Sequence, residues 1–198
     1  MQRVCVYCGS SAGWRAEYGQ AAGMLSEGLA SHRLGLVFGG GKIGLMGVLA
    51  RAILARGGEV IGVIPRALQE QGLAQPELTK LRVVETMHER KALMAGLSDG
   101  FVALPGGLGT LEEFFEILTW AQLGLHSKPC GLLNVGGYFD HLIAFLDHAV
   151  QEGFIDPAHR ALFVTEPEPQ ALLDKLAAYE PPLVDKVQWA LGGNAGLE

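Results

Sequence analysis

The sequence predicts an α/β fold, with one doubly wound, mostly parallel sheet and helices on both of its faces. Short runs of apolar residues alternate along the chain with longer segments of helical periodicity. The apolar runs are continuous and do not alternate with polar residues, which indicates strands buried on both faces, as in a parallel sheet. Strands of this kind that alternate with helices form βαβ units.

Each element has its own signal in the chain. The first apolar run is VCVY, and the second, LGLVF, leads into a glycine loop. Two further runs, VIGVI and FVAL, each end at a proline. The remaining runs are LRVV, CGLLN and LFV. We expect these strands at residues 4–7, 34–38, 60–64, 81–84, 101–104, 130–134 and 162–164. The segments between them repeat apolar residues three and four positions apart. We expect those helices at residues 16–31, 45–56, 88–97, 111–123, 139–151 and 170–179.

The domain organisation is simple. With 198 residues the chain has room for one ordinary domain, and no linker long enough to divide it is present. We therefore expect residues 1–180 to form one Rossmann-like domain. A tail with Pro and Gly at both of its ends follows at 181–198, and we expect that tail to be mobile.

Composition excludes several classes of protein. The chain carries 15 basic and 21 acidic residues, a net charge of −6, and has no basic run, which argues against a nucleic-acid partner. No apolar run is long enough to span a membrane, and the start leads directly into a strand, so we expect neither a membrane partner nor a secretory leader. Three cysteines are too few for a disulfide framework and fit a cytoplasmic protein. Cys5 and Cys8 lie three apart on a strand, so we expect them to pack in the core on opposite faces.

The first of two glycine loops has the sequence GGGKIGLMG, at 39–47, between a strand and a helix. Glycines let backbone N–H groups approach an anion, and the following helix start adds its positive dipole end. A dinucleotide fingerprint would need the first strand of the fold and an acidic residue after the next one, and neither is present. A Walker A loop would need Ser or Thr after Lys42. Tight helix–strand packing is the alternative without a ligand.

The second glycine loop has the sequence PGGLGTLEE, at 105–113, and also joins a strand to a helix. One interpretation makes Thr110 the N-cap of that helix, with Glu113 closing a capping box. The other notes that two anion-binding loops meet at the carboxyl ends of parallel strands, where open α/β sheets bind ligands. A carboxylate beside a phosphate site is then useful only if it faces something cationic, such as a sugar that develops positive charge.

A cationic segment, MHERK at 87–91, lies between the two loops. Arg90 and Lys91 near the start of a helix oppose its dipole, and an anionic ligand would offset that cost. The alternative is an ordinary solvated charged face.

Taken together at these spacings, GGGKIGLMG, MHERK and PGGLGTLEE resemble the LONELY GUY (LOG) family, the cytokinin riboside 5′-monophosphate phosphoribohydrolases that are often labelled lysine decarboxylases. The resemblance runs from about residue 3 to residue 165 and includes CVYCGSS and TWAQLGLHSKPCGLLNVGGYF. It implies a nucleotide-binding domain that hydrolyses the N-glycosidic bond of AMP and N6-modified (cytokinin) nucleoside 5′-monophosphates. The products would be free base and ribose 5-phosphate. It also implies a homodimer, with no cofactor and no metal.

The same resemblance assigns site residues. It points to Arg90 and Glu113 as catalytic. The residues that match family ligand contacts are expected to bind substrate: Ser10, Gly40, Gly41, Gly44, Met46, Met87, Lys91, Pro105, Gly106, Gly107, Leu108, Gly109, Thr110, Leu111, Glu112 and Thr119. A gap-free alignment places Gly72, with Glu70 two residues earlier, where plant members carry an acidic residue, and Gly136 where they carry an aspartate.

These residue types suit the reaction. Breaking a ribosyl C–N bond builds oxocarbenium character on the sugar, which a carboxylate such as Glu113 can stabilise while it orients or deprotonates water. The planar fork of Arg90 can hold phosphate or polarise a leaving group. A non-catalytic nucleotide or molybdenum-cofactor carrier on the same fold is the alternative, although a carrier would not need both residues. A pyridoxal phosphate decarboxylase would need a Schiff-base lysine, and the two candidates, Lys42 and Lys91, adjoin phosphate loops.

The remaining signals are weaker. The six histidines show no metal spacing beyond His141 and His148. Phe114, Phe115 and Trp120 on the helix after the second loop are expected in the core or at a dimer interface, and framing an adenine pocket is their alternative role.

Overall fold

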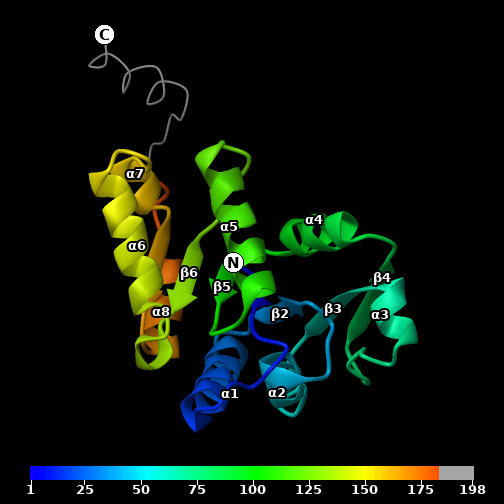
Figure 1. Cartoon of the computed structure of the whole chain (residues 1–198). Coiled ribbons are helices and arrows are strands. Elements are labelled where there is room, and N and C mark those ends of the chain that lie inside the picture. Colours follow the sequence, from blue (N-terminus) through cyan, green and yellow to red (C-terminus); the bar gives the residue numbers. More distant parts are fainter. Residues whose placement is uncertain (183–198) are drawn as a thin grey trace.

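Figure 1 shows the computed structural model of the chain, which describes residues 1–182. One parallel sheet has the strand order β4-β3-β2-β1-β5-β6-β7, which confirms the predicted fold class. Its strands are β1 (Arg3–Tyr7), β2 (Gly35–Phe38), β3 (Val60–Pro65), β4 (Lys80–Val84), β5 (Gly100–Ala103), β6 (Cys130–Leu133) and β7 (Phe163–Glu166). The predicted tail from 183 onwards lies outside the described residues.

Helices connect the strands and cover both faces of the sheet. They are α1 (Ala16–Ser31), α2 (Gly44–Leu54), α3 (Arg66–Glu70), α4 (Met87–Leu97), α5 (Leu108–Gln122), α6 (Asp140–Gln151), α7 (Pro157–Arg160) and α8 (Pro169–Ala177), with the 3₁₀ turn η1 (Val135–Gly137) before α6. In residues 1–182, no helix is both long and apolar enough to cross a membrane.

The order of the strands creates the ligand crevice. From β1 the chain adds β2, β3 and β4 on one side and then returns to add β5 on the other. The loops that leave β1 and β5 therefore diverge to opposite faces, and a crevice forms outside the carboxyl ends of the strands at this point. Both predicted glycine loops leave strands that pair with β1.

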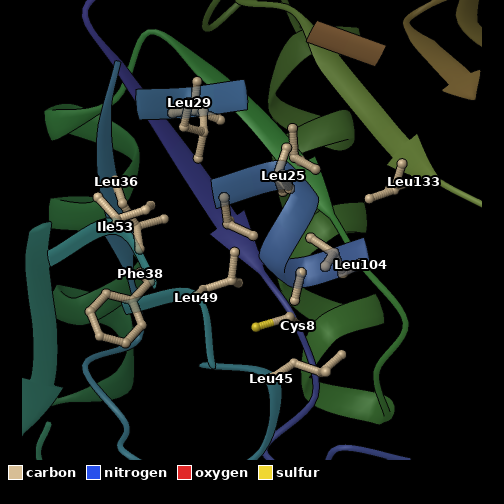
Figure 2. Close-up of a cluster of buried hydrophobic side chains, with 14 of the residues drawn as sticks. Cys8, Leu25, Leu29, Leu36, Phe38, Leu45, Leu49, Ile53, Leu104 and Leu133 are labelled. Atoms are coloured by element: carbon tan, nitrogen blue, oxygen red, sulfur yellow. The ribbon is translucent and has the colours of Figure 1, made fainter. Parts of the chain in front are cut away.

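Two apolar cores lie on the two faces of the sheet. Figure 2 shows one of them, where Leu25 and Leu29 of α1 and Leu49 and Ile53 of α2 pack on strand side chains. The other core joins the sheet to α4, α5 and α6. Burial of each such side chain contributes about 1.5–3 kcal/mol, so the two cores hold the strand ends in fixed positions.

The two neighbouring cysteines divide between these cores, as predicted. Cys8 belongs to the core shown in Figure 2 and Cys5 to the opposite one. Both thiols are free and buried.

The structure corrects the predicted start of α5. The helix begins at Leu108, three residues before the predicted 111, and its N-cap is Gly107 without a side-chain cap hydrogen bond. Thr110 lies inside the first turn, so the interpretation of Thr110 and Glu113 as a capping box is wrong. The prediction failed because a backbone glycine cap leaves the first N–H groups open and gives no side-chain signal.

Candidate active site

A cavity of about 450 Å³ lies at the carboxyl ends of β1, β2 and β3, between the two glycine loops. Half of the predicted site residues line it together, from four separate segments: Ser10, Gly41, Met46, Arg90, Gly107, Leu108, Gly109, Thr110 and Glu113. The fold thus brings both predicted catalytic residues to the wall of one cavity.

The other predicted residues lie around this wall and do not line it: Gly40, Gly44, Met87, Lys91, Pro105, Gly106, Leu111, Glu112 and Thr119. Met87 contacts Arg90 and not the cavity itself, since its sulfur lies 3.7 Å from Arg90 Nη1. Thr119 is exposed and donates to the Phe115 carbonyl of its own helix. Phe114 is buried in the core, and neither it nor Phe115 or Trp120 lines the cavity.

Arg90 is fixed by acceptors from three segments. It lies on α4 and is buried, with 9% of its surface exposed. Its Nε donates to the Val63 carbonyl at 3.1 Å, and its Nη2 donates to the Gly39 carbonyl at 3.3 Å. Its Nη1 lies 3.3 Å from Glu113 Oε1. A guanidinium carries more N–H groups than these acceptors use, so the others can meet a ligand in the cavity.

Gly39 makes room for this guanidinium. A Cβ at Gly39 would overlap Arg90 Nη2 and would lie 3.1 Å from Arg90 Cζ. The first glycine of the loop therefore admits a side chain from α4, 51 residues further along the chain. The loop needs a glycine at this position because the Arg90 side chain packs against the backbone there, and not only because a ligand approaches the backbone.

Glu113 is a buried carboxylate with an unusual environment. It lies on α5, 9% exposed, and its carboxylate meets Arg90. Burial raises the pKa of Glu113, and Arg90 opposes that shift without cancelling it. A carboxyl group whose pKa is shifted by burial in a cavity is a candidate catalytic group. Once ionised, it has few other partners and interacts strongly with a positive charge that develops beside it.

Lys91, the second cation of the MHERK segment, binds protein carboxylates. Its ammonium group is buried and contacts Glu112 and Glu116, the latter at 3.0 Å. The hydrogen bond to Glu112 raises the pKa of Lys91, so the ammonium stays charged. The interpretation of Arg90 and Lys91 as a solvated charged face is therefore wrong. Carboxylates of α5 supply the negative charge that these two cations need.

We expect the titration of Glu113 to limit activity at low pH. A pKa raised above the ordinary 4.5 means that the carboxylate protonates earlier on acidification than an exposed glutamate. Between 4.5 and the raised pKa the folded state binds more protons than the unfolded chain, so the free energy of unfolding falls as pH rises through that window.

Infrared difference spectra of the substrate-free protein would follow this carboxylate directly. The expected result is a carboxylate band that appears above pH 4.5 and is missing from Glu113→Gln. A band with a midpoint at or below 4.5 would contradict the assignment. The substrate phosphate titrates near pH 6, which is why the substrate-free protein is measured.

The start of α5 has the features of an anion site. Gly107, Leu108, Gly109 and Thr110 line the cavity, and they contain the N-cap and the first turn of the helix. The N–H groups of a first helical turn have no acceptor within the helix and carry its positive dipole end. Since no side chain caps this helix, a phosphate can accept these hydrogen bonds.

The sequence-based prediction missed an apolar wall. Ile43, Ile64, Leu68 and Leu73 also line the cavity. Leu68 lies on α3 and Leu73 on the loop that follows it. That loop is tied to the first glycine loop, since Lys42 N donates to the Leu73 carbonyl at 3.0 Å. Leucines within an otherwise polar segment after Pro65 were the available signal. A planar base fits such a wall.

Within the described part of the chain, no group of three or more His, Cys, Asp or Glu side chains has the arrangement of a metal site.

Comparisons with known proteins find proteins similar to this chain. A family model described as possible lysine decarboxylase matches residues 46–176. A probable cytokinin riboside 5′-monophosphate phosphoribohydrolase of Oryza sativa subsp. japonica is 54% identical over 180 residues, which cover 91% of this chain and 79% of that protein. A cytokinin riboside 5′-monophosphate phosphoribohydrolase of Arabidopsis thaliana is 50% identical over 191 residues, covering 95% of this chain and 84% of that protein.

More distant solved structures share the fold. The molybdenum cofactor carrier protein of Chlamydomonas reinhardtii superposes with a TM-score of 0.67 at 21% identity, covering 90% of this chain and 99% of that one. The molybdenum cofactor binding protein of Rippkaea orientalis gives a TM-score of 0.64 at 16% identity, covering 89% and 96%. At such identities the likeness concerns architecture alone.

Proposed function

The chain belongs to the family of cytokinin riboside 5′-monophosphate phosphoribohydrolases, whose family model is described as possible lysine decarboxylase, and on this premise we propose how it acts. It hydrolyses the N-glycosidic bond of N6-modified nucleoside 5′-monophosphates and of AMP. The observation that carries the proposal is the buried Arg90–Glu113 pair beside an uncapped helix start in one cavity.

The cavity divides into three parts that match such a substrate. The 5′-phosphate accepts hydrogen bonds from the start of α5. The base lies against the apolar wall with Ile64 and Leu68. The ribose then lies between them, next to Glu113 and Arg90. Phosphate binding thus supplies remote binding energy to the reacting C–N bond.

The reaction breaks one bond and forms another at the ribose C1′. The bond to the base nitrogen breaks with its electron pair on the base, and C1′ gains oxocarbenium character that the Glu113 carboxylate stabilises. Water, oriented or deprotonated by Glu113, adds its oxygen to C1′. The departing base takes up a proton, and the Arg90 guanidinium polarises a leaving group or holds phosphate. The products are free base and ribose 5-phosphate.

We also propose a cytoplasmic homodimer. Large apolar side chains are exposed near the end of α5 and along α6. Leu125, just after α5, is 68% exposed, Phe145 on α6 is 63% exposed, and Phe154, just after α6, is 79% exposed. α5 and α6 pack in the same core, on one face of the sheet. A second copy that covers these side chains would remove them from water. The three free buried thiols suit a reducing compartment.

We expect nucleosides without the 5′-phosphate to be processed far more slowly than their monophosphates. Each lost charge-assisted hydrogen bond costs about 1.5–3 kcal/mol, or about ten- to a hundredfold in rate. The measurement is release of free base from a panel that pairs adenosine with AMP and each N6-modified nucleoside with its 5′-monophosphate. Comparable turnover within a pair would contradict the phosphate site.

The same panel tests the function itself. A protein that releases base from at least one monophosphate is the hydrolase. One that binds AMP tightly by calorimetry and releases no base from any member would instead favour the carrier alternative.

A further inference from the structure

A second, smaller cavity adjoins the substrate cavity on the other side of the PGG loop. It measures about 260 Å³ and shares Ser10 and Gly107 with the first. Tyr138, which follows η1, closes one side of it. This tyrosine does not line the substrate cavity.

Tyr138 holds a carbonyl of the loop that separates the cavities. Its hydroxyl donates a hydrogen bond to the Gly106 carbonyl at 2.7 Å, although the two residues are 32 apart in the chain. The preceding carbonyl, of Pro105, accepts from Gly9 N at 3.0 Å. Two successive carbonyls of the loop are therefore fixed from outside the substrate cavity.

The tyrosine is itself held in place. Asn134 fixes the turn that carries Tyr138 through two hydrogen bonds of 2.7 Å. Its Oδ1 accepts from Phe139 N, and its Nδ2 donates to Asp140 Oδ1. The ring of Tyr18 meets the Tyr138 ring edge-on, with centroids 5.6 Å apart. The hydroxyl therefore presents one direction to the Gly106 carbonyl.

Peptide geometry converts this contact into an effect on the substrate cavity. In a planar trans peptide the C=O of Gly106 and the N–H of Gly107 point in opposite directions. A carbonyl drawn towards Tyr138 therefore turns the Gly107 N–H away from the second cavity, and Gly107 also lines the first. Among residues 1–182, this N–H has no backbone acceptor. The loop packs closely against α5 at this point, because a Cβ at Gly106 would overlap the Thr110 hydroxyl.

We propose that Tyr138 is a positioning residue: its hydrogen bond to Gly106 aims the Gly107 N–H at the 5′-phosphate of the substrate. The proposal rests on the proposed function for the identity of the ligand. It adds a residue that never touches the nucleotide and yet sets the affinity for its phosphate.

Tyr138→Phe tests the proposal, because it removes the hydroxyl and keeps the ring. We expect KM for the nucleoside monophosphate to rise about fivefold to tenfold, the range of one hydrogen bond, with kcat within about twofold. Inhibition by ribose 5-phosphate should weaken in parallel, whereas inhibition by free adenine should not change. Tyr179→Phe is the matched control, since the Tyr179 hydroxyl also donates to a backbone carbonyl, that of Leu162, at 3.3 Å.

A second readout keeps the proposal testable apart from turnover. In the wild type, inorganic phosphate should shift the Gly107 amide resonance, and Tyr138→Phe should need about fivefold to tenfold more phosphate for the same shift. A lower unfolding temperature with unchanged KM, inhibition and phosphate titration would overturn the proposal and leave a structural tyrosine. A wild type that shows the phosphate shift but releases no base would overturn the proposed function instead.

Discussion

Replacing Glu113 by glutamine is expected to lower turnover by about 10²-fold or more while nucleotide binding survives. Glutamine keeps the size of the side chain and an oxygen that can accept from Arg90, but it carries no charge to stabilise an oxocarbenium ion. Release of adenine from AMP measures the turnover, and calorimetry measures binding separately.

Stability should not follow activity in this variant. Since burial already disfavours the charged form of Glu113, its neutral replacement removes that cost, and we expect the unfolding temperature to stay close to the wild-type value. Glu59→Gln is the matched control, because Glu59 also meets an arginine, Arg3, with Nε and Oε2 2.8 Å apart, away from the cavity. Near-normal turnover of Glu113→Gln would remove this residue from the catalytic assignment.

Gly39→Ala should lower turnover by about 10²-fold, because a displacement of about 1 Å in a positioned group can cost that much. The added Cβ would occupy the space of Arg90 Nη2, and the guanidinium would have to leave both the Gly39 carbonyl and Glu113. The measurement is base release under saturating substrate, together with the chemical shift of the Arg90 Nε–H.

Gly96→Ala is the control for this experiment. It lies on α4 with Arg90, and a Cβ there would meet nothing within 4 Å. It should therefore leave both turnover and the Arg90 resonance as they are. If Gly39→Ala moved the Arg90 resonance and kept full turnover, the position of the guanidinium would not matter for catalysis.

The fold could be predicted from the sequence because its signals are local. Strands such as β1 and β2 are continuous apolar runs. Such runs are typical of strands that are buried on both faces, as in a parallel sheet. Two short helices, α3 and α7, were missed, since four or five residues are too few to show a helical period. The start of α5 was misplaced because its cap is a backbone glycine.

The candidate site was predictable only as far as its motifs extend. The glycine loops are visible in the sequence and the family resemblance points to Arg90 and Glu113, and the structure brings them to one cavity. The partners of Lys91 could not be predicted, because an ion pair with Glu112 and Glu116 depends on how α4 packs against α5. The apolar wall at Leu68 and Leu73 comes from α3 and the loop after it, whose path is set by backbone hydrogen bonds to the first glycine loop.

The buried cysteines allow unfolding of the protein to be followed by thiol labelling. All three thiols of the chain are free, and Cys5, Cys8 and Cys130 are 0%, 7% and 0% exposed. Burial raises the pKa of Cys130 to about 12, so the reactive thiolate is suppressed in the folded state. For Cys5 and Cys130, which do not line the substrate cavity, a thiol reagent must therefore wait for the chain to open. Because Cys5 belongs to the core that joins the sheet to α4, α5 and α6, its labelling reports the opening of that face of the sheet.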